Sequence, residues 1–263
     1  MHTIASIRNP LLKEIRRAQT RGTLTADGCA VAESFHLLEE ALRSGCEVPA
    51  VLAAESVRST VEQHVARLKN TRFTVLSDAV FESVAATESS QGVLALVRPP
   101  HWAMEQTLRG RSLVVVLDGV QDPGNAGTIV RSAEAFGSTG VVFLKGSVSP
   151  YNSKALRASA GSLFRLPVVQ GIDPALAKAA LQQKRLDVYS AAGKDGRSLR
   201  DIDFTRRSAI IIGSEGRGVG EKLRGIATDI TVPTIGVESL NAAVAASVIL
   251  YEASRQRRAA PSL

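Results

Sequence analysis

Residues 229–257, DITVPTIGVESLNAAVAASVILYEASRQR, decide the fold of this chain. A β-branched run ends at Pro233, a short glycine-containing loop follows, and an alanine-rich stretch with the composition of a long helix comes next. In α/β proteins, ligands bind where a strand ends in a loop that leads to a helix N-terminus, because free N–H groups face them. This loop carries Glu238, Ser239 and Asn241, which are more polar side chains than helix capping requires.

Two further segments have the same arrangement of strand, polar loop and helix or turn. Residues 113–137 are LVVVLDGVQDPGNAGTIVRSAEAFG, and residues 208–219 are SAIIIGSEGRGV. Together with residues 229–257, they resemble motifs 1, 2 and 3 of the SpoU (TrmH) family of RNA ribose methyltransferases, within the SPOUT superfamily. The order of the motifs and their spacing to the C-terminus both match. The resemblance is strong over residues 111–258 and looser before them.

Apolar runs alternate with helical patterns through the C-terminal part. We expect strands at 113–118, 140–145, 187–191, 208–213 and 229–232, and helices at 125–136, 153–161, 174–184 and 239–257. Continuous Val/Ile/Leu strands are typical of a parallel sheet covered on both faces. General packing rules favour an ordinary doubly wound sheet, because knots are rare. The resemblance implies instead a SPOUT-type α/β fold with a deep trefoil knot, in which the last helix threads a loop.

The N-terminal part reads as a separate, small α/β unit over residues 1–100. We expect helices at Leu11–Gln19 and Phe35–Arg43 and strands at 49–53 and 92–97. Residues 101–110 follow two prolines and make the best candidate linker before the domain at 111–258. By resemblance, residues 1–100 form an RNA substrate-binding domain similar to the ribosomal L30e-like fold.

Composition limits the class of protein. The 263 residues carry a formal net charge of +7, which suits a polyanionic partner without identifying it. Cys29 and Cys46 fit no zinc motif and are expected to be reduced thiols in the cytoplasm. The N-terminus has no apolar signal-peptide region, and no apolar run could span a bilayer. We therefore expect a cytoplasmic protein without a membrane or metal partner.

Nucleotide sites of other classes fit poorly. A dinucleotide-binding fingerprint needs G-x-G-x-x-G after an early strand. The glycines at 213, 216, 218 and 220 are wrongly spaced and lie late in the chain, and no Walker A loop is present.

In motif 1, Asn125 can either cap a helix or act in the site, and the two roles are compatible. Arg131 matches the family arginine, which implies that it reaches the partner subunit's site and contacts an RNA phosphate or the reacting ribose. The alternative is a solvated arginine. An arginine is too basic (pKa above about 12) to act readily as a general base, so positioning is its first expected role.

Motifs 2 and 3 supply the other expected catalytic residues. By resemblance, Glu215 lies near the active site and holds Arg131 or Asn125; otherwise it is an exposed turn carboxylate. Ser239 can be a simple helix cap, whereas the family implies catalytic or ribose-contacting roles for Ser239 and Asn241. The family also implies a methyl-donor pocket for S-adenosylmethionine, built from Ile212, Gly213, Val232, Ile235 and Leu240.

Basic residues at two places are candidates for RNA contact. Arg8, Lys13, Arg16 and Arg17 form an N-terminal strip with few aromatic residues, which favours contact with the RNA backbone over base stacking. Lys154 and Arg157, together with Arg165, lie in a segment at 151–167 that also resembles the family. Solvated helix faces remain an alternative for both groups.

The resemblance implies a homodimeric, S-adenosylmethionine-dependent RNA 2′-O-ribose methyltransferase. The methyl group moves by direct displacement at an activated donor, so no metal or covalent intermediate is needed. Ribosomal RNA of the large subunit is the first expected substrate, and transfer RNA is the second. Two other classes stay open, a non-catalytic RNA-binding protein of the same fold and a nucleotide-binding enzyme outside RNA biology.

Overall fold

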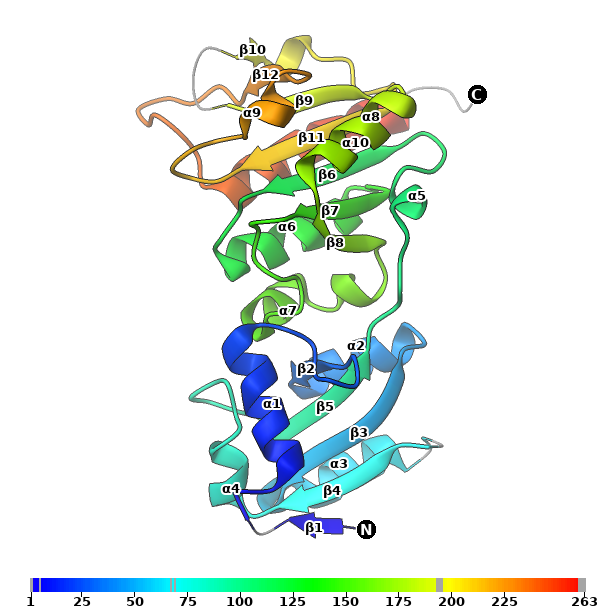
Figure 1. Ribbon diagram of the computed structural model, residues 1–263, viewed down its shortest axis with the longest axis vertical. Coiled ribbons are helices and arrows are strands. Elements are labelled where there is room, and N and C mark those ends of the chain that lie inside the picture. The colour runs from blue at the N-terminus through cyan, green and yellow to red at the C-terminus, as the bar shows by residue number, and fades with distance from the viewer. Residues whose placement is uncertain (1, 5, 67, 69, 193–195, 260–263) are drawn as a thin grey trace. The chain divides into compact units, whose positions relative to one another are not determined.

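The computed structural model describes residues 2–4, 6–66, 68, 70–192 and 196–259, and the chain divides into two compact units (Figure 1). The first unit comprises residues 1–100 together with 151–165, and the second comprises 101–150 and 166–263. The segment 151–165, which the sequence placed in the C-terminal domain, therefore packs with the N-terminal part.

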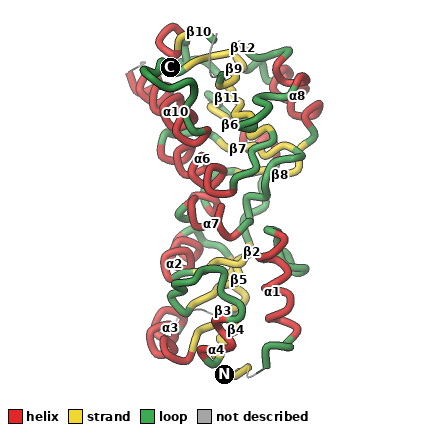
Figure 2. Tube along the Cα trace, turned by 90° about the vertical axis from the view of Figure 1, so that its left-hand side faces the viewer, coloured by secondary structure: helices red, strands yellow, loops and turns green. Residues whose placement is uncertain are grey.

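The first unit is built on a five-stranded mixed sheet in the order β1-β4-β3-β5-β2. Strand β5 is antiparallel to both of its neighbours. Figure 2 shows α1 on one side of this sheet and α2 and α3 on the other. The strands are β1 (His2–Ile4), β2 (Ala30–Glu33), β3 (Glu47–Ala54), β4 (Arg72–Leu76) and β5 (Val93–Arg98). The helices are α1 (Pro10–Arg21), α2 (Phe35–Arg43), α3 (Arg58–Val65), α4 (Asp78–Glu82) and α7 (Ser153–Ser159).

Helix α1 begins where the sequence predicts. The Asn9 side chain accepts a hydrogen bond from the Leu11 N–H, and Pro10 occupies the first turn. Its apolar residues Leu12 and Ile15 are buried against the sheet. The opposite face stays polar.

The second unit has a seven-stranded sheet in the order β10-β12-β9-β11-β6-β7-β8, with every pairing parallel. The middle strands are buried along almost their whole length, as their continuous apolar sequences predict. The expected parallel sheet is confirmed. The strands are β6 (Leu113–Asp118), β7 (Gly140–Leu144), β8 (Val168–Ile172), β9 (Asp187–Ala191), β10 (Arg197–Ser198), β11 (Ser208–Gly213) and β12 (Thr228–Thr231).

Helices cover both faces of this sheet, with α6 and α10 on one side and α8 on the other (Figure 2). Helices α6 and α10 pack together, and the Ser132 and Ser247 hydroxyls share a hydrogen bond of 2.7 Å. The helices are α5 (Met104–Thr107), α6 (Pro123–Ala135), α8 (Pro174–Gln183), α9 (Glu221–Arg224) and α10 (Ala242–Ala259). In the described part of the chain, no helix is long and apolar enough to cross a membrane. Threading of the last helix through a knot stays a prediction from the family.

Residues 101–110, the expected linker, instead pack against the second unit. Trp102 and Met104 lie partly buried on its core, and Thr107 and Leu108 are fully or almost fully buried. Apolar side chains in this segment are removed from water when they cover the sheet, and this burial stabilises a fixed position for the segment. A flexible linker would leave the same side chains exposed.

Candidate active site at the ends of three parallel strands

The three motifs meet at the carboxyl edge of the parallel sheet, in the loops after β6, β11 and β12. The loop after β11 is closed by two backbone hydrogen bonds between Ser214 and Gly218, of 2.9 and 3.1 Å. A Cβ atom on Gly213 would lie 2.2 Å from the carbonyl carbon of Gly218. Only glycine therefore fits at this position, and the turn depends on it.

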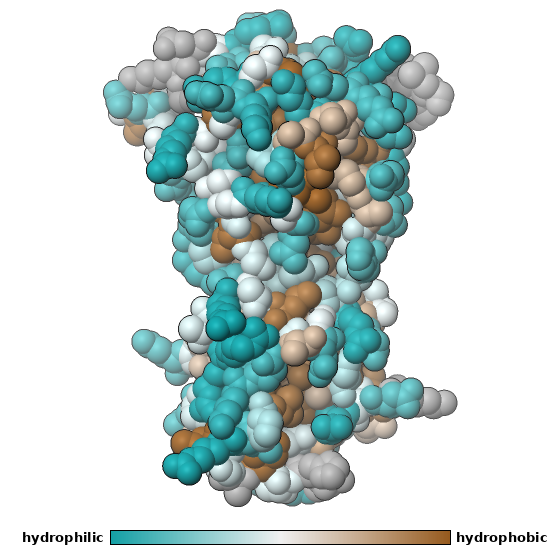
Figure 3. All heavy atoms as spheres, viewed as in Figure 1, coloured by the Kyte–Doolittle hydropathy of each residue, from teal (hydrophilic) through white to brown (hydrophobic). Residues whose placement is uncertain are grey.

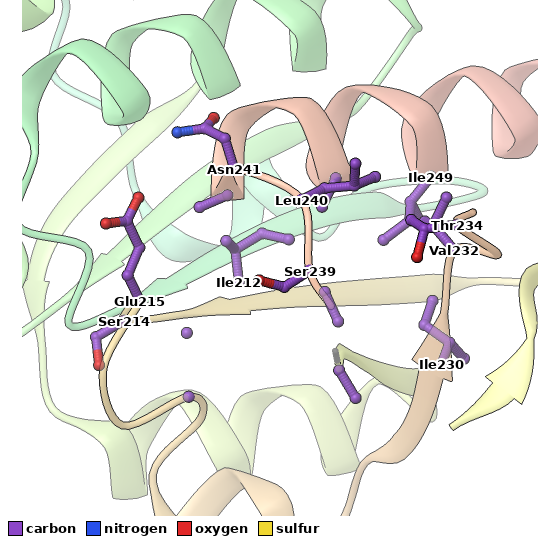
Figure 4. A pocket seen from close by; sticks show the side chains of 16 residues that line it. Ile212, Ser214, Glu215, Ile230, Val232, Thr234, Ser239, Leu240, Asn241 and Ile249 are labelled. Carbon is purple, nitrogen blue, oxygen red and sulfur yellow. The ribbon is translucent and has the colours of Figure 1, made fainter. Parts of the chain in front are cut away.

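A cavity of about 500 Å³ lies between the ends of β9, β11 and β12, the loops that follow them, and α10. Four of the five residues expected to bind the methyl donor line it, namely Ile212, Gly213, Val232 and Leu240. Glu215, Ser239 and Asn241 line it too. Figure 4 shows Glu215 and Asn241 at one end and the apolar side chains of Ile230, Val232 and Ile249 at the other. The cavity thus has one polar end and one apolar end.

Ile235 does not belong to this cavity, contrary to expectation. Its side chain is fully exposed, at 101% relative accessibility. The loop turns outward at Gly236, which has a left-handed φ of 79°, and the Thr234 hydroxyl closes the turn by donating to the Val237 carbonyl over 2.9 Å. Ile235 lies within that turn and points to solvent.

Several cavity residues escaped the sequence analysis. Ala191 and Ala192 come from the end of β9, and Ala245 and Ile249 come from α10. Two signals could have found them. Strand β9 ends at the same edge of the sheet as the motif strands, and residues 242, 245 and 249 recur on one helix face.

A chain of hydrogen bonds joins the three motifs. The Asn241 side-chain oxygen accepts hydrogen bonds from the Ala243 and Val244 N–H groups, over 2.9 and 3.3 Å. Asn241 Nδ2 donates to Asn125 Oδ1 over 3.0 Å, and Asn125 Nδ2 donates to Glu215 Oε1 over 2.9 Å. The helix N–H groups can bond only to the side-chain oxygen of Asn241, so its amide nitrogen must face Asn125. The oxygen of Asn125 then accepts from Asn241, and its nitrogen is left to donate to Glu215, which fixes the carboxylate in place.

These contacts correct the expected helix starts. The side chain of Asp122 caps α6 by accepting from the Asn125 N–H over 2.7 Å, so Asn125 lies inside the helix and does not cap it. Asn241, rather than Ser239, caps α10. Ser239 is left free to face the cavity.

A second, smaller cavity of about 200 Å³ adjoins the first. It is lined by Gln121, Asp122 and Asn125 from motif 1 and shares Gly213, Ser214, Glu215 and Ala242 with the larger cavity. Glu215 therefore stands between two spaces, and a ligand in either one can meet its carboxylate.

Arg131 lines neither cavity and is exposed on α6. Among the described residues it makes no hydrogen bond or ion pair, and Glu215 bonds Asn125 instead. In its own subunit, Arg131 is therefore not part of the site.

The basic candidates for RNA contact differ in their availability. Arg8 and Lys13 are exposed, whereas Arg16 donates to the Ile7 carbonyl. Arg17 forms two hydrogen bonds to Glu14, of 2.6 and 2.8 Å, and lowers the pKa of that carboxyl to about 2. Hydrophilic side chains cover the surface over α1 (Figure 3).

On α7, Lys154 is exposed, and Arg157 is partly buried. Arg157 lines a polar hollow with Glu33 and Ser34. Within the described residues, no group of three or more His, Cys, Asp or Glu side chains could hold a metal ion.

Comparison with known proteins agrees with this geometry. The model of the SpoU rRNA methylase family matches residues 112–251, and that of the MRM3-like substrate binding domain matches residues 9–95. The chain is 34% identical over 256 residues to the 23S rRNA (guanosine(2553)-2′-O)-methyltransferase RlmP of Bacillus subtilis, covering 95% of this chain and 98% of that one. It is 33% identical to the 23S rRNA (guanosine-2′-O-)-methyltransferase RlmB of Xanthomonas campestris, over 80% and 88% of the two chains.

A solved structure extends the comparison to the whole fold. The SpoU methyltransferase AviRb from Streptomyces viridochromogenes, in complex with the cofactor AdoMet, superposes with a TM-score of 0.85 at 27% identity, over 97% of this chain and 100% of that one. The matches span both units and all three motifs, and so this chain belongs to the SpoU rRNA methylase family.

Proposed function

We propose that the protein transfers a methyl group from S-adenosylmethionine to the 2′-hydroxyl of a ribose in large-subunit ribosomal RNA. The observation that carries this proposal is the fixed Glu215 carboxylate between a large and a small cavity. Relatives that are named 23S rRNA 2′-O-methyltransferases support the choice of RNA. We place the reaction in the cytoplasm.

The larger cavity fits the methyl donor. Its volume of about 500 Å³ falls within the usual range for small-molecule sites, of roughly 300–1,000 Å³. Ile230, Val232 and Ile249 offer an apolar surface for the adenine ring, and Gly213 lets the backbone approach the ligand closely. When bound, S-adenosylmethionine supplies a methyl group that its sulfonium already activates.

The smaller cavity takes the acceptor ribose. There the Glu215 carboxylate accepts a hydrogen bond from the 2′-hydroxyl, directs its oxygen toward the larger cavity and takes up the hydroxyl proton when the oxygen is methylated. Asn125 and Asn241 hold Glu215 by the hydrogen bonds described above, so no reorientation is needed when the substrate enters. The Ser239 hydroxyl contacts the ribose or the donor from the cavity wall.

A second copy of the chain completes the site. Val244, Val248 and Tyr251 lie 50%, 37% and 57% exposed at a helical spacing along α10, which is unusual for large apolar side chains. A partner packed on this face would bury them, and the exposed Arg131 of each subunit would then reach the other subunit's cavity. There its guanidinium would bind an RNA phosphate or the reacting ribose.

Methyl transfer to separated RNA pools tests the proposal. The full-length protein is incubated with labelled S-adenosylmethionine and unmodified 23S rRNA, 16S rRNA or tRNA, and the RNA is digested to nucleosides. We expect a 2′-O-methylnucleoside from 23S rRNA, and none with the Glu215→Gln variant. Label in tRNA alone would move the substrate to that class. Absence of donor binding would favour a non-catalytic RNA-binding protein.

A further inference from the structure

A cavity of about 470 Å³ lies in the first unit, between α1 and the ends of strands β3, β4 and β5. Its floor is apolar, because Cys29, Ala50 and Leu96 are all buried there. Ala50 and Leu96 are direct partners in the sheet. Leu11 and Glu14 of α1 form the facing wall. This cavity is separate from the methyltransferase site, which lies in the second unit.

Neutral polar, negatively charged and positively charged side chains surround this floor. Asp27, Asn70, Arg72 and Arg98 line the cavity and are all exposed. Burial raises the pKa of the Cys29 thiol, while the nearby Arg98 lowers it and Asp27 raises it further. The side chains of Arg98 and Asp27 therefore both approach the floor near Cys29 from the rim of the cavity.

The charge balance favours a neutral ligand. In the lining, Glu14 and Asp27 balance Arg72 and Arg98. The neighbouring partners, Arg17 bound to Glu14 and Glu47 at 3.5 Å from Arg98, cancel each other as well, so an isolated phosphate gains little there. An apolar floor with donors and acceptors on the rim matches the flat face and polar edge of a nucleobase. Proteins recognise unpaired RNA bases through such edges.

Guanine matches the rim best. Its O6 and N7 accept from arginine, and its N1–H and N2–H₂ donate to a carboxylate. Uracil has two carbonyl acceptors and a single N–H donor, so it leaves part of the rim unpaired. Arg8 lies just before α1 and Lys13 lies on it. Both are exposed and can bind the phosphates next to the guanine nucleotide.

We propose that this cavity takes up one unpaired guanine base of the RNA substrate and so contributes to substrate selection. Arg72 and Arg98 donate to the O6 and N7 edge, and Asp27 accepts from the N1 and N2 edge. The inference rests on the proposed function in one respect, that the substrate is RNA.

Binding of short oligonucleotides to the full-length protein tests the inference without methyl transfer. The probes are labelled pentaribonucleotides UUGUU, UUUUU and UUIUU, in which inosine lacks the 2-amino group. We expect UUGUU to bind about tenfold more tightly than UUUUU by fluorescence anisotropy, with UUIUU between them. Arg98→Gln and Asp27→Asn should remove this preference. Arg58→Gln, a change of the same type on α3 at a half-exposed arginine that pairs with Glu55 and Glu62 and does not line the cavity, should keep it.

A cavity-filling variant gives a second readout. Ala50→Leu adds volume to the floor and should remove the guanine preference, whereas Ala79→Leu, at an exposed position of α4, should not. Equal binding of UUGUU and UUUUU overturns the inference, and so does a preference that survives both Arg98→Gln and Asp27→Asn. Methyl transfer without guanine preference would remove only this inference. Guanine preference without methyl transfer would remove only the proposed function.

Discussion

Asn125 donates a hydrogen bond of 2.9 Å to Glu215, although 90 residues separate them in the chain. Asn125 is also the only link from Glu215 to Asn241 among the hydrogen bonds described, since its oxygen accepts from that residue. The carboxylate that faces both cavities is thus held by an amide with both of its polar atoms engaged.

Removing this amide should lower the rate of methyl transfer more than it weakens donor binding. Asn125→Ala frees the Glu215 carboxylate, and we expect kcat to fall about 10- to 100-fold, as small misplacements of reacting groups do. Steady-state kinetics and donor titration would separate the two effects. Gln182→Ala, at an exposed position of α8, is the control. An Asn125→Ala enzyme with unchanged kcat would contradict the assigned role of Glu215.

Two glycines of one loop should respond differently to alanine. At Gly213 an added Cβ meets the Gly218 backbone at 2.2 Å, whereas at Gly216 it meets no atom within 4 Å. Overpacking costs about 1–3 kcal/mol. Because the clash would displace the loop that lines the donor cavity, a loss of this size in binding energy would raise the donor Kd of Gly213→Ala about 5- to 150-fold. Gly216→Ala should leave it nearly unchanged. Calorimetric titration with S-adenosylmethionine measures both, and equal effects of the two changes would count against the cavity as the donor site.

Mixed dimers test whether Arg131 acts across the subunit interface. Arg131→Ala and Glu215→Gln should each be inactive as homodimers. After unfolding and refolding together in equal amounts, roughly one quarter of the wild-type activity should return, because half of the dimers are mixed and each has one intact site. If Arg131 served its own subunit, no mixed dimer would contain an intact site. The absence of recovery in verified mixed dimers would therefore rule out the crossed arrangement.

The last helix is anchored by Arg257. Its guanidinium donates to four backbone carbonyls, those of Arg111, Ser112, Phe204 and Arg206. Burial lowers its pKa to about 10, so it stays charged at neutral pH.

Arg257→Met leaves these carbonyls without their charged donor. It should cost about 2–4 kcal/mol and lower Tm by roughly 5–10 °C. Arg258→Met changes the neighbouring exposed arginine and should have little effect. Thermal unfolding of both variants would show whether a fall in Tm comes from the lost hydrogen bonds of Arg257 or from the loss of one positive charge.

Stability at low pH should depend on Glu14. Its pKa is lowered from 4.5 to about 2, chiefly by the Arg17 hydrogen bonds, so its ionised form stabilises the folded state. That contribution is complete above pH 4.5 and is lost as the pH falls from 4.5 to 2. The Tm difference between wild type and Glu14→Gln should therefore be largest near pH 6 and shrink toward pH 2. A constant difference would indicate that charge plays no part.

Much of this architecture could be predicted from the sequence. Continuous apolar runs located β6 and β11, and amphipathic spacing with a glycine stop located α2. Strands β1, β2, β4, β8 and β10 were missed. Length alone does not explain this, since β9 and β12, of five and four residues, were predicted. Strand β2 is rich in alanine and β8 contains Gln170 and Gly171, residues that carry little strand signal. Starts of helices were misplaced where two polar residues compete to cap. Asp122 caps α6 instead of Asn125, whose side chain binds the distant Glu215.

The site was predicted less completely than the fold. Motif spacing brought Glu215, Ser239 and Asn241 to one cavity, but it could not show that the loop turns Ile235 outward. Nor could it show that Glu14 already engages Arg17. Both outcomes depend on loop geometry and side-chain partners that no local pattern encodes.

The chain passes between the two units three times, after residues 100, 150 and 165. Neither unit is therefore a contiguous module that a single cut could release. A truncation at residue 100 would deprive β2 of α7 and Glu40 of its ion pair with Arg165. Recombination that exchanges the N-terminal part among relatives must accordingly preserve, or supply anew, a matching segment from the middle of the gene.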